Sequence, residues 1–300
     1  MKILITGSDG QLGQELQRIF RMGCSELGEI PAALQNGDII SVDIDRLDIS
    51  DRQAVATFVE EQHPDVIINC AGYTNVDGCE TNADLAMSAN ALGPRNLAMA
   101  AESVDAKLIH ISTDYVFSGT EEKPRSEGDI CAPSSVYGVS KHLGDQYVQT
   151  FCKRHFIVRT AWLYGYVGKN FVKTILKAGK DRSALKIVND QRGNPTNAAD
   201  LAHHLLKLAV TEEYGLYHAT NNGTCSWYEF ACAFVEMAGF PCEITPCTSE
   251  EFPSPTKRPA YSSLDNRMLR CTVGDEMRDW KDAIASYMTH YNKESGEITL

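Results

Sequence analysis

Residues 2–13 read KILITGSDGQLG, and this stretch indicates the architecture of the first half of the chain. An apolar run typical of a buried strand, 2–6, leads directly into glycines at positions 7, 10 and 13. Glycines there allow a tight turn and let a pyrophosphate approach the start of a helix, where free N–H groups favour anions. A strand before the glycines and a helix after them are the context that a dinucleotide site requires. The stretch therefore predicts binding of NADPH or NADH.

The alternation of strand and helix continues to about residue 160. Further apolar strands are predicted at 38–42, 65–69, 107–111 and 156–160. Helices are predicted at 11–22, at 51–62 with Ser50 as the N-cap, and at 82–102. Another helix begins near Tyr137. Short strands and helices in this order imply right-handed crossovers and a parallel sheet covered on both faces. The sequence thus predicts an α/β fold, with a Rossmann-type doubly wound parallel sheet.

Beyond residue 160 the alternation loosens. Helices are predicted near 169–179, 198–210, 226–238 and 276–291. The stretch 239–261 contains five prolines and is predicted to form no regular element. We therefore predict a dinucleotide-binding Rossmann domain at 1–160 and a smaller, mainly substrate-binding C-terminal part at 161–300. Some segments of the second part are expected to return to the first.

Composition and charge exclude several classes of protein. The 300 residues carry 28 Lys and Arg against 40 Asp and Glu, a net charge of −12, and contain no basic block. This argues against a partner that is a nucleic acid or a membrane surface. No apolar run approaches the ~20 residues of a transmembrane helix. The N-terminus lacks the pattern of a secretory signal, so we expect a cytoplasmic protein.

Two further motifs suggest carbonyl reduction. The fourth strand continues into Ser112, Thr113 and Asp114, at the sheet edge where ligands bind in this architecture. Tyr137 and Lys141 are four residues apart and share one helix face. A ketone that accepts a hydride needs a proton donor at its oxygen. We predict that Tyr137 is this donor, that Thr113 hydrogen-bonds the oxygen, and that Lys141 lowers the tyrosine pKa and holds the nicotinamide ribose.

The second and third strands supply further candidate cofactor contacts. Asp43 ends the second strand, where a carboxylate can bind the adenosine ribose and would repel a 2′-phosphate, which favours NADH weakly. Asp48 and Ile49 are candidates to flank the adenine, although both acids could instead be loop or capping residues. Ala71 and Gly72 are small enough for close approach of the cofactor. The remaining predicted cofactor contacts are Gly7, Gly10, Gln11, Leu12, Gly13, Tyr73, Thr74, Tyr137 and Lys141.

The glycine turn, the STD tripeptide and the YxxxK pair together resemble the extended short-chain dehydrogenase/reductases. Within that superfamily, longer pieces resemble the dTDP-4-dehydrorhamnose reductase family, among them GSDGQLGQEL (7–16), ISTDYVFSGT (111–120), VNDQRGNPT (188–196) and RPAYSSLDNRML (258–269). The resemblance implies NAD(P)H-dependent reduction of the C4 ketone of dTDP-4-dehydrorhamnose to dTDP-L-rhamnose, the last step of its synthesis. It also implies a dTDP-linked sugar as substrate and allows a homodimer.

The resemblance also assigns roles to individual residues. Thr113, Tyr137 and Lys141 would be catalytic. Substrate contacts would come from Val76, Asp77, Asp114, Trp162 and Arg258. Trp162 would offer an apolar face to the sugar and Arg258 a cation to the diphosphate, unless they are a core tryptophan and a surface arginine. Some members bind magnesium between subunits through glutamates. Glu15 matches one of these, but the second is missing after NPT, so no metal site is predicted.

Three other functions remain possible at this point. A nucleotide-sugar 4,6-dehydratase would need two acids after Thr113, whereas Asp114 is followed by Tyr115. A 4-epimerase would hold NAD⁺ tightly and return it unchanged. A non-catalytic, NADP-binding regulatory subunit is the alternative from another class, since the fold resembles the β subunit of methionine adenosyltransferase. The intact Thr113, Tyr137 and Lys141 favour an active reductase.

Overall fold

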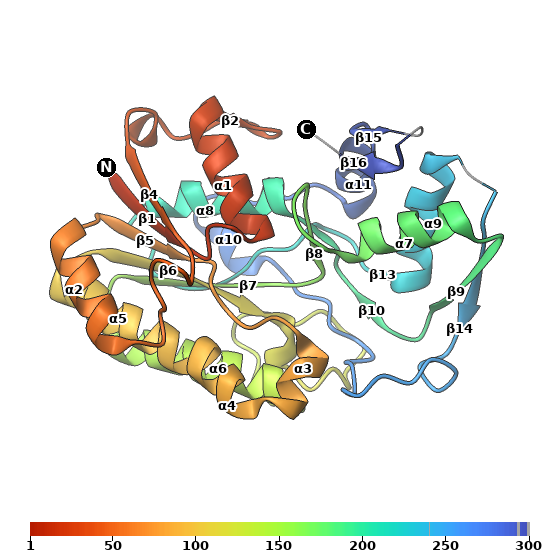
Figure 1. Cartoon of the computed structure of the whole chain (residues 1–300), viewed down its shortest axis with the longest axis horizontal. Coiled ribbons are helices and arrows are strands. Elements are labelled where there is room, and N and C mark those ends of the chain that lie inside the picture. The colour runs from red at the N-terminus through yellow and green to blue at the C-terminus, as the bar shows by residue number, and fades with distance from the viewer. Residues whose placement is uncertain (240, 293–294, 299–300) are drawn as a thin grey trace.

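The computed structural model describes residues 1–239, 241–292 and 295–298. Its central six-stranded parallel sheet lies between two layers of helices (Figure 1). The last residues of the predicted second domain, 293–294 and 299–300, lie outside this description, as does Phe240. The sheet has the order β12-β7-β6-β5-β1-β4, and every neighbouring pair is parallel. Its strands are β1 (Lys2–Thr6), β4 (Asp38–Val42), β5 (Val66–Asn69), β6 (Lys107–Thr113), β7 (His155–Thr160) and β12 (Gly215–His218). The predicted α/β class is confirmed.

Helices cover both faces of the sheet, and successive side chains of a strand point to opposite faces, so each strand contributes to two cores. In β1, Ile3 and Ile5 pack into the core beneath α1 (Gln11–Met22) and α8 (Ala198–Ala209), while Leu4 packs on the opposite face. That opposite face is covered by α2 (Arg52–Gln62), α5 (Gly93–Ser103) and α6 (Val136–Phe151). Strand order reverses at β1, between β4 and β5. A crevice for ligands is expected at the carboxyl ends of the strands there.

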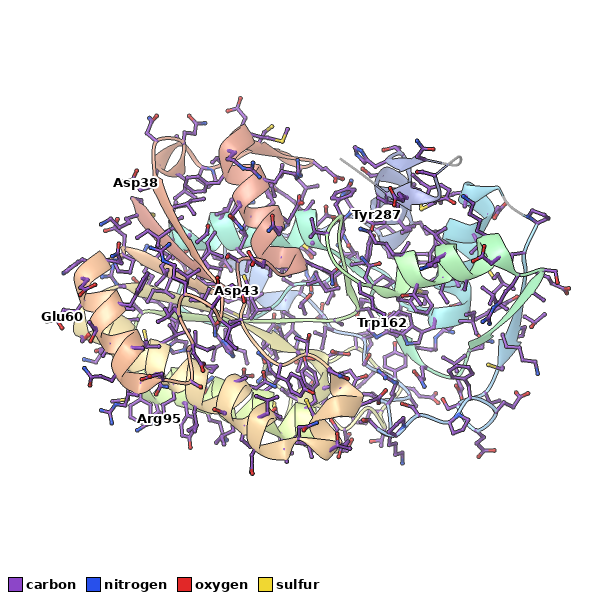
Figure 2. All side chains as sticks on the ribbon, viewed as in Figure 1. Asp38, Asp43, Glu60, Arg95, Trp162 and Tyr287 are labelled. Atoms are coloured by element: carbon purple, nitrogen blue, oxygen red, sulfur yellow. The ribbon has the colours of Figure 1, made fainter. Side chains whose placement is uncertain are left out.

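The C-terminal half has a hydrophobic core of its own. Tyr164, Phe230 and Tyr287 are fully buried in it, and Figure 2 shows Tyr287 inside this half, well away from Glu60 and Arg95 on the outer helices. Its main elements are α7 (Phe171–Asp181), β9 (Ala184–Val188), α9 (Trp227–Ala238), β14 (Glu243–Cys247) and α11 (Trp280–Met288), whereas α10 (Arg267–Cys271) packs on β12 and joins the core of the large sheet. The later segments α8 and β12 pack instead with the first half.

Short elements complete the fold. The helical ones are η1 (Ala32–Leu34), α3 (Val76–Thr81), α4 (Ala83–Met87), a π-helical segment η2 (Ser88–Leu92) and η3 (Asp114–Val116). Two-residue strands pair as β2 (Cys24–Ser25) with β3 (Gly28–Glu29), β8 (Leu163–Tyr164) with β11 (Thr196–Asn197), β10 (Arg192–Gly193) with β13 (Cys225–Ser226), and β15 (Tyr291–Asn292) with β16 (Glu297–Ile298). Within the described residues, no helix has the length and apolar character needed to cross a membrane.

Several local predictions were wrong. Ser50 does not cap α2; Asp51 does, accepting hydrogen bonds from the backbone N–H groups of Gln53 and Ala54. The proline-rich stretch 239–261 does contain a regular element, because β14 pairs with β9. In such a two-stranded ribbon a proline is tolerated where its backbone nitrogen faces away from the partner strand, because no hydrogen bond is needed there. The helix expected at 82–102 is divided by the π-helical segment, and β12 had not been predicted at all.

Candidate active site

The glycine turn leaves the start of α1 open. Gly7 has φ +66°, and a Cβ atom there would lie 2.5 Å from the backbone nitrogen of Ala71. A Cβ at Gly13 would lie 2.4 Å from the carbonyl oxygen of Gly7. Gly10, the N-cap of α1, provides no side-chain cap for the first N–H groups of the helix. The turn thus combines close backbone packing with unsatisfied donors, the arrangement that a pyrophosphate requires.

One cavity of about 890 Å³ connects this turn to the C-terminal half. Residues from the ends of β1, β4, β5 and β6, from the start of α6 and from the C-terminal half line it. All the predicted catalytic and cofactor residues lie on its wall, namely Gly7, Gly10, Gln11, Leu12, Gly13, Asp43, Asp48, Ile49, Ala71, Gly72, Tyr73, Thr74, Thr113, Tyr137 and Lys141. Of the predicted substrate residues, Val76, Asp114, Trp162 and Arg258 line it, and Asp77 does not. Their roles stay predictions.

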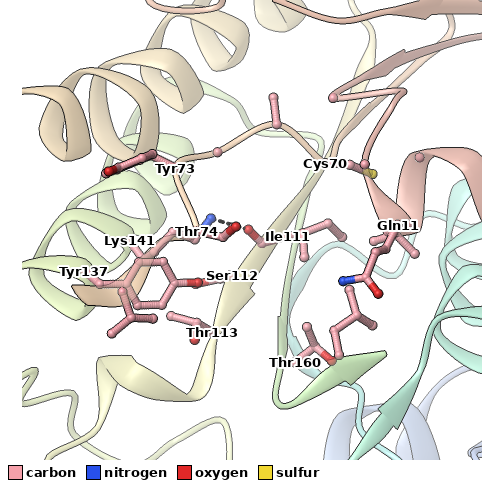
Figure 3. A pocket seen from close by; sticks show the side chains of 18 of the residues that line it. Gln11, Cys70, Tyr73, Thr74, Ile111, Ser112, Thr113, Tyr137, Lys141 and Thr160 are labelled. Atoms are coloured by element: carbon pink, nitrogen blue, oxygen red, sulfur yellow. Dashed lines mark hydrogen bonds between the residues drawn. The ribbon is translucent and has the colours of Figure 1, made fainter. Parts of the chain in front are cut away.

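Thr113, Tyr137 and Lys141 come from two adjacent elements. Thr113 is the last residue of β6, and its hydroxyl donates a 2.9 Å hydrogen bond to the carboxylate of Asp114. Tyr137 and Lys141 lie in the first turns of α6, which Ser135 caps by accepting from the Gly138 N–H. Both side chains are buried and lie beside Thr113 in the pocket (Figure 3). The ammonium of Lys141 donates to the carbonyl oxygen of Ile111.

Burial dominates the protonation of these groups. It raises the pKa of Tyr137, although a hydrogen bond with Thr113 opposes the rise. The predicted lowering of this pKa by Lys141 is therefore not the net result, and the tyrosine stays a phenol at neutral pH. Burial lowers the pKa of Lys141 to about 8, against the opposing charge of Asp145. It also raises the pKa of Asp114 to about 6.

The end of the cavity predicted to hold adenosine is acidic. Asp43 accepts hydrogen bonds from two backbone N–H groups, those of Asp9 at 2.9 Å and Ile44 at 2.8 Å. Asp9 and Asp48 also line this end. Arg46 lies over the ring of Phe58, 5.5 Å from its centroid, and is not on the cavity wall. Figure 2 shows Asp43 near the end of the sheet.

Aromatic side chains close the opposite end. Trp162 has φ +48°, a strained conformation for a bulky residue, which the surrounding structure must hold in place. Its ring is stacked on Trp227, with centroids 3.6 Å apart and planes 7° from parallel, and Phe171 packs against Trp227 at 4.4 Å. Sequence reasoning missed Trp227 and Phe171. Two aromatics at the starts of helices in the second half were the only available signal, and that pattern is as common in ordinary cores.

A buried ion pair lies on the face of α6 that carries Lys141. Asp145 follows Lys141 by one helical turn, and its carboxylate accepts a 3.1 Å hydrogen bond from Arg159 of β7. Asp145 is 1% exposed and Arg159 3% exposed. The ring of His110 stands 3.8 Å from the same carboxylate. Charge on α6 is therefore balanced inside the protein, where an isolated ion would be costly.

Glu15 makes an ion pair with Arg18 on the same helix, with the closest nitrogen and oxygen 2.5 Å apart. No cluster of three or more His, Cys, Asp or Glu side chains suited to a metal ion occurs within residues 1–239, 241–292 and 295–298.

Comparison with known proteins shows similarity over almost the whole chain. The model of a family described as RmlD substrate binding domain matches residues 1–293. The spore coat polysaccharide biosynthesis protein SpsK of Bacillus subtilis (strain 168) is 38% identical over 287 residues, which cover 96% of each chain.

Two solved structures are similar in both sequence and fold. A dTDP-4-dehydrorhamnose reductase from Clostridium acetobutylicum ATCC 824 is 46% identical with a TM-score of 0.91, and the match covers 96% of this chain and 99% of the other. A dTDP-4-dehydrorhamnose reductase from Bacillus anthracis str. Ames, solved in complex with NADP, is 41% identical with a TM-score of 0.89, over 96% and 98% of the two chains.

Proposed function

Since the chain belongs to the RmlD substrate binding domain family, we propose that it is an NAD(P)H-dependent oxidoreductase that reduces the C4 ketone of dTDP-4-dehydrorhamnose to dTDP-L-rhamnose. One observation carries the proposal. Thr113, Tyr137 and Lys141 line the same cavity as the glycine turn at the start of α1. The proposed proton donor and the proposed cofactor residues thus line one cavity of about 890 Å³. The proposed reaction is the last step of dTDP-L-rhamnose synthesis.

The residues of this chain would handle the proton and the position of the substrate. When bound, the reduced nicotinamide supplies a hydride to the ketone carbon. Tyr137 donates its phenolic proton to the ketone oxygen. Thr113 redirects its hydroxyl proton from the Asp114 carboxylate to the same oxygen and stabilises its developing charge. Lys141 provides a cation beside Tyr137 and binds the ribose next to the nicotinamide. Because burial raises the pKa of Tyr137, the donor is protonated when the ketone arrives.

The remaining wall residues suit a nucleotide sugar. The faces of Trp162 and Trp227 provide an apolar surface for the substrate, and Arg258 provides a cation for the diphosphate. Asp114 is the single acid after Thr113, and Tyr115 stands where a dehydratase would need a second one. We therefore favour reduction over dehydration. A homodimer and a cytoplasmic location stay predictions, which sedimentation of the purified protein and cell fractionation would test.

The proposal is tested by following the oxidation of NADPH and NADH, with substrate generated in situ by the upstream dehydratase and 3,5-epimerase. We expect rapid oxidation that depends on the epimerase and yields dTDP-L-rhamnose. Oxidation without the epimerase would point to a different 4-ketosugar. Purified protein that retains NAD⁺ and consumes neither reduced cofactor would favour an epimerase, and folded protein that binds cofactor without turnover would favour the regulatory alternative.

Cofactor preference is expected to depend on Asp43. Replacing Asp43 by Asn removes a negative charge at the adenosine end, where a 2′-phosphate would lie close to it. We expect the ratio of kcat/KM for NADPH to that for NADH to rise roughly tenfold. Asp45→Asn is the matched control, because Asp45 carries the same charge but does not line the cavity. An equal change in both variants would show that the effect is not local to the ribose.

The pH dependence of kcat/KM for the cofactor is expected to follow the ionisation of Lys141. Its ammonium form predominates below its pKa of about 8 and is lost above it. We expect kcat/KM for the cofactor, which reports ionisations of the free enzyme, to fall as the pH rises above about 8. Lys141→Arg keeps the positive charge up to a pH of roughly 12, so its profile should lack this fall even if its activity is lower. The same fall in Lys141→Arg would assign the ionisation to another group.

A further inference from the structure

Asp77 is the one predicted substrate residue that does not line the cavity. It lies in the first turn of α3, and its Oδ2 atom is 3.2 Å from Nη2 of Arg258. Its Oδ1 atom accepts hydrogen bonds from the Ser254 hydroxyl at 3.0 Å and from the Thr256 N–H at 3.3 Å. The carboxylate is 37% exposed. Asp77 therefore joins α3 to the segment 254–258, which belongs to the C-terminal half.

Arg258 joins this contact to the cavity wall. Its Nη1 atom donates a 3.2 Å hydrogen bond to the hydroxyl of Tyr115, and both residues line the cavity. The guanidinium is 32% exposed. Tyr115 and Asp77 come from the first half of the chain and Arg258 from the second, so the contacts span the boundary between the two halves. Arg258, the predicted cation for the substrate diphosphate, is therefore already paired with the carboxylate of Asp77.

We propose that Asp77 is a positioning residue that holds Arg258 in the substrate-free protein and releases it to the diphosphate of the nucleotide sugar. This inference rests on the proposed function, because the ligand is the diphosphate of that substrate. A diphosphate offers more acceptor oxygens and more negative charge than one carboxylate, and the guanidinium fork can bind two of these oxygens at once.

The exchange costs Asp77 little. The carboxylate keeps the hydrogen bonds from Ser254 and Thr256, and its exposure lets water replace the lost contact with Arg258. A partly exposed ion pair of this kind contributes little to stability, so it can be broken by a ligand. Direct binding of the diphosphate by Asp77 is disfavoured, because both groups are anionic. The carboxylate instead competes with the ligand for the same cation.

Competition predicts opposite effects for the two partners. Asp77→Asn frees Arg258, so the affinity for dTDP should rise by about 2- to 5-fold. Arg258→Gln removes the cation, so the affinity should fall by roughly tenfold or more. A pair with only a structural role would move both affinities in the same direction. The sign of the Asp77 effect therefore separates the two explanations.

The experiment is calorimetric titration of the full chain with dTDP and, separately, with inorganic pyrophosphate. Asp265→Asn is the control, because Asp265 pairs with Arg270 at similar exposure and does not line the cavity. We expect tighter binding in Asp77→Asn, weaker binding in Arg258→Gln and unchanged binding in Asp265→Asn, for both ligands. Weaker or unchanged binding of dTDP in a folded Asp77→Asn protein overturns the proposal, as does a gain seen equally in Asp265→Asn.

The titrations and the cofactor-oxidation assay together separate this inference from the proposed activity. If the variants change the affinity for dTDP as expected but the wild-type protein reduces no ketone, the reductase is refuted and the exchange stands. Turnover of dTDP-4-dehydrorhamnose with dTDP affinity unaffected by Asp77→Asn would refute the exchange and leave the reductase intact.

Discussion

Replacing Tyr137 with phenylalanine is expected to lower turnover by ~10²–10⁴ while the protein still folds and binds cofactor. The substitution removes only the hydroxyl, and the ring keeps its place against Tyr115, with centroids 5.4 Å apart. Without the phenolic proton, the oxygen of the ketone must take its proton from water as the hydride arrives. The loss should appear in kcat, because the proton is needed in the transition state.

The matched control is Tyr147→Phe. Tyr147 lies on the same helix, packs against Phe151 and Arg95, and does not line the cavity. Steady-state kinetics of both variants, together with calorimetric titration of the cofactor, separate catalysis from binding. Near-wild-type turnover in Tyr137→Phe would refute the assignment of the proton donor. An equal loss in Tyr147→Phe would show that the helix, not the hydroxyl, is responsible.

Replacing Arg159 with methionine is expected to lower the free energy of unfolding by ~3–5 kcal/mol. Arg159 and Asp145 are almost completely buried, and their charges compensate each other. Methionine fills part of the space but leaves the carboxylate without its cation in the protein interior. Asp145 lies one turn after Lys141 on α6. A disturbance of α6 at Asp145 should displace Lys141, so we expect the activity to fall together with the free energy of unfolding.

Chemical denaturation measures this effect. The control is Lys153→Met, because Lys153 pairs with Glu102 at 3.4 Å but is 90% exposed, and breaking such a pair costs less than ~1 kcal/mol. The double variant Arg159→Met with Asp145→Leu removes both charges and should be more stable than Arg159→Met alone. If Arg159→Met were no more destabilising than Lys153→Met, the buried pair would have no special role.

The spacing of apolar residues was sufficient to predict those helices and strands that pack against the central core. The predicted helix at 11–22 matches α1 because its apolar side chains recur at helical spacing and face one core. The strands at 2–6 and 38–42 match β1 and β4. The apolar run of β1 is buried between the two helical layers, whereas β4 is an edge strand in which only Val42 is fully buried. These patterns are local and need no knowledge of the rest of the chain.

Prediction failed where a distant partner determined the outcome. Strand β12 is a short segment that is stabilised by pairing with β7, and β14 is ordered by pairing with β9 despite its proline. The N-cap of α2 went to Asp51 over Ser50 because backbone geometry, not residue type, decides which neighbour accepts the hydrogen bonds. Neither strand has a signal in its adjacent residues, whereas the capping error was local, because Ser50 and Asp51 are both residue types that cap helices.

By itself the sequence predicted the α/β class, the position of the glycine turn and about half of the residues that line the cavity, some of these only through the family resemblance. It could do so because a turn after a strand, and two side chains four residues apart on a helix, are short-range geometry. Only the tertiary structure decided that burial raises the pKa of Tyr137, that Trp162 stacks on Trp227, and that Asp77, which is not on the cavity wall, pairs with Arg258, which is. Burial and pairing depend on segments far apart in the chain, which meet only when the two halves pack together.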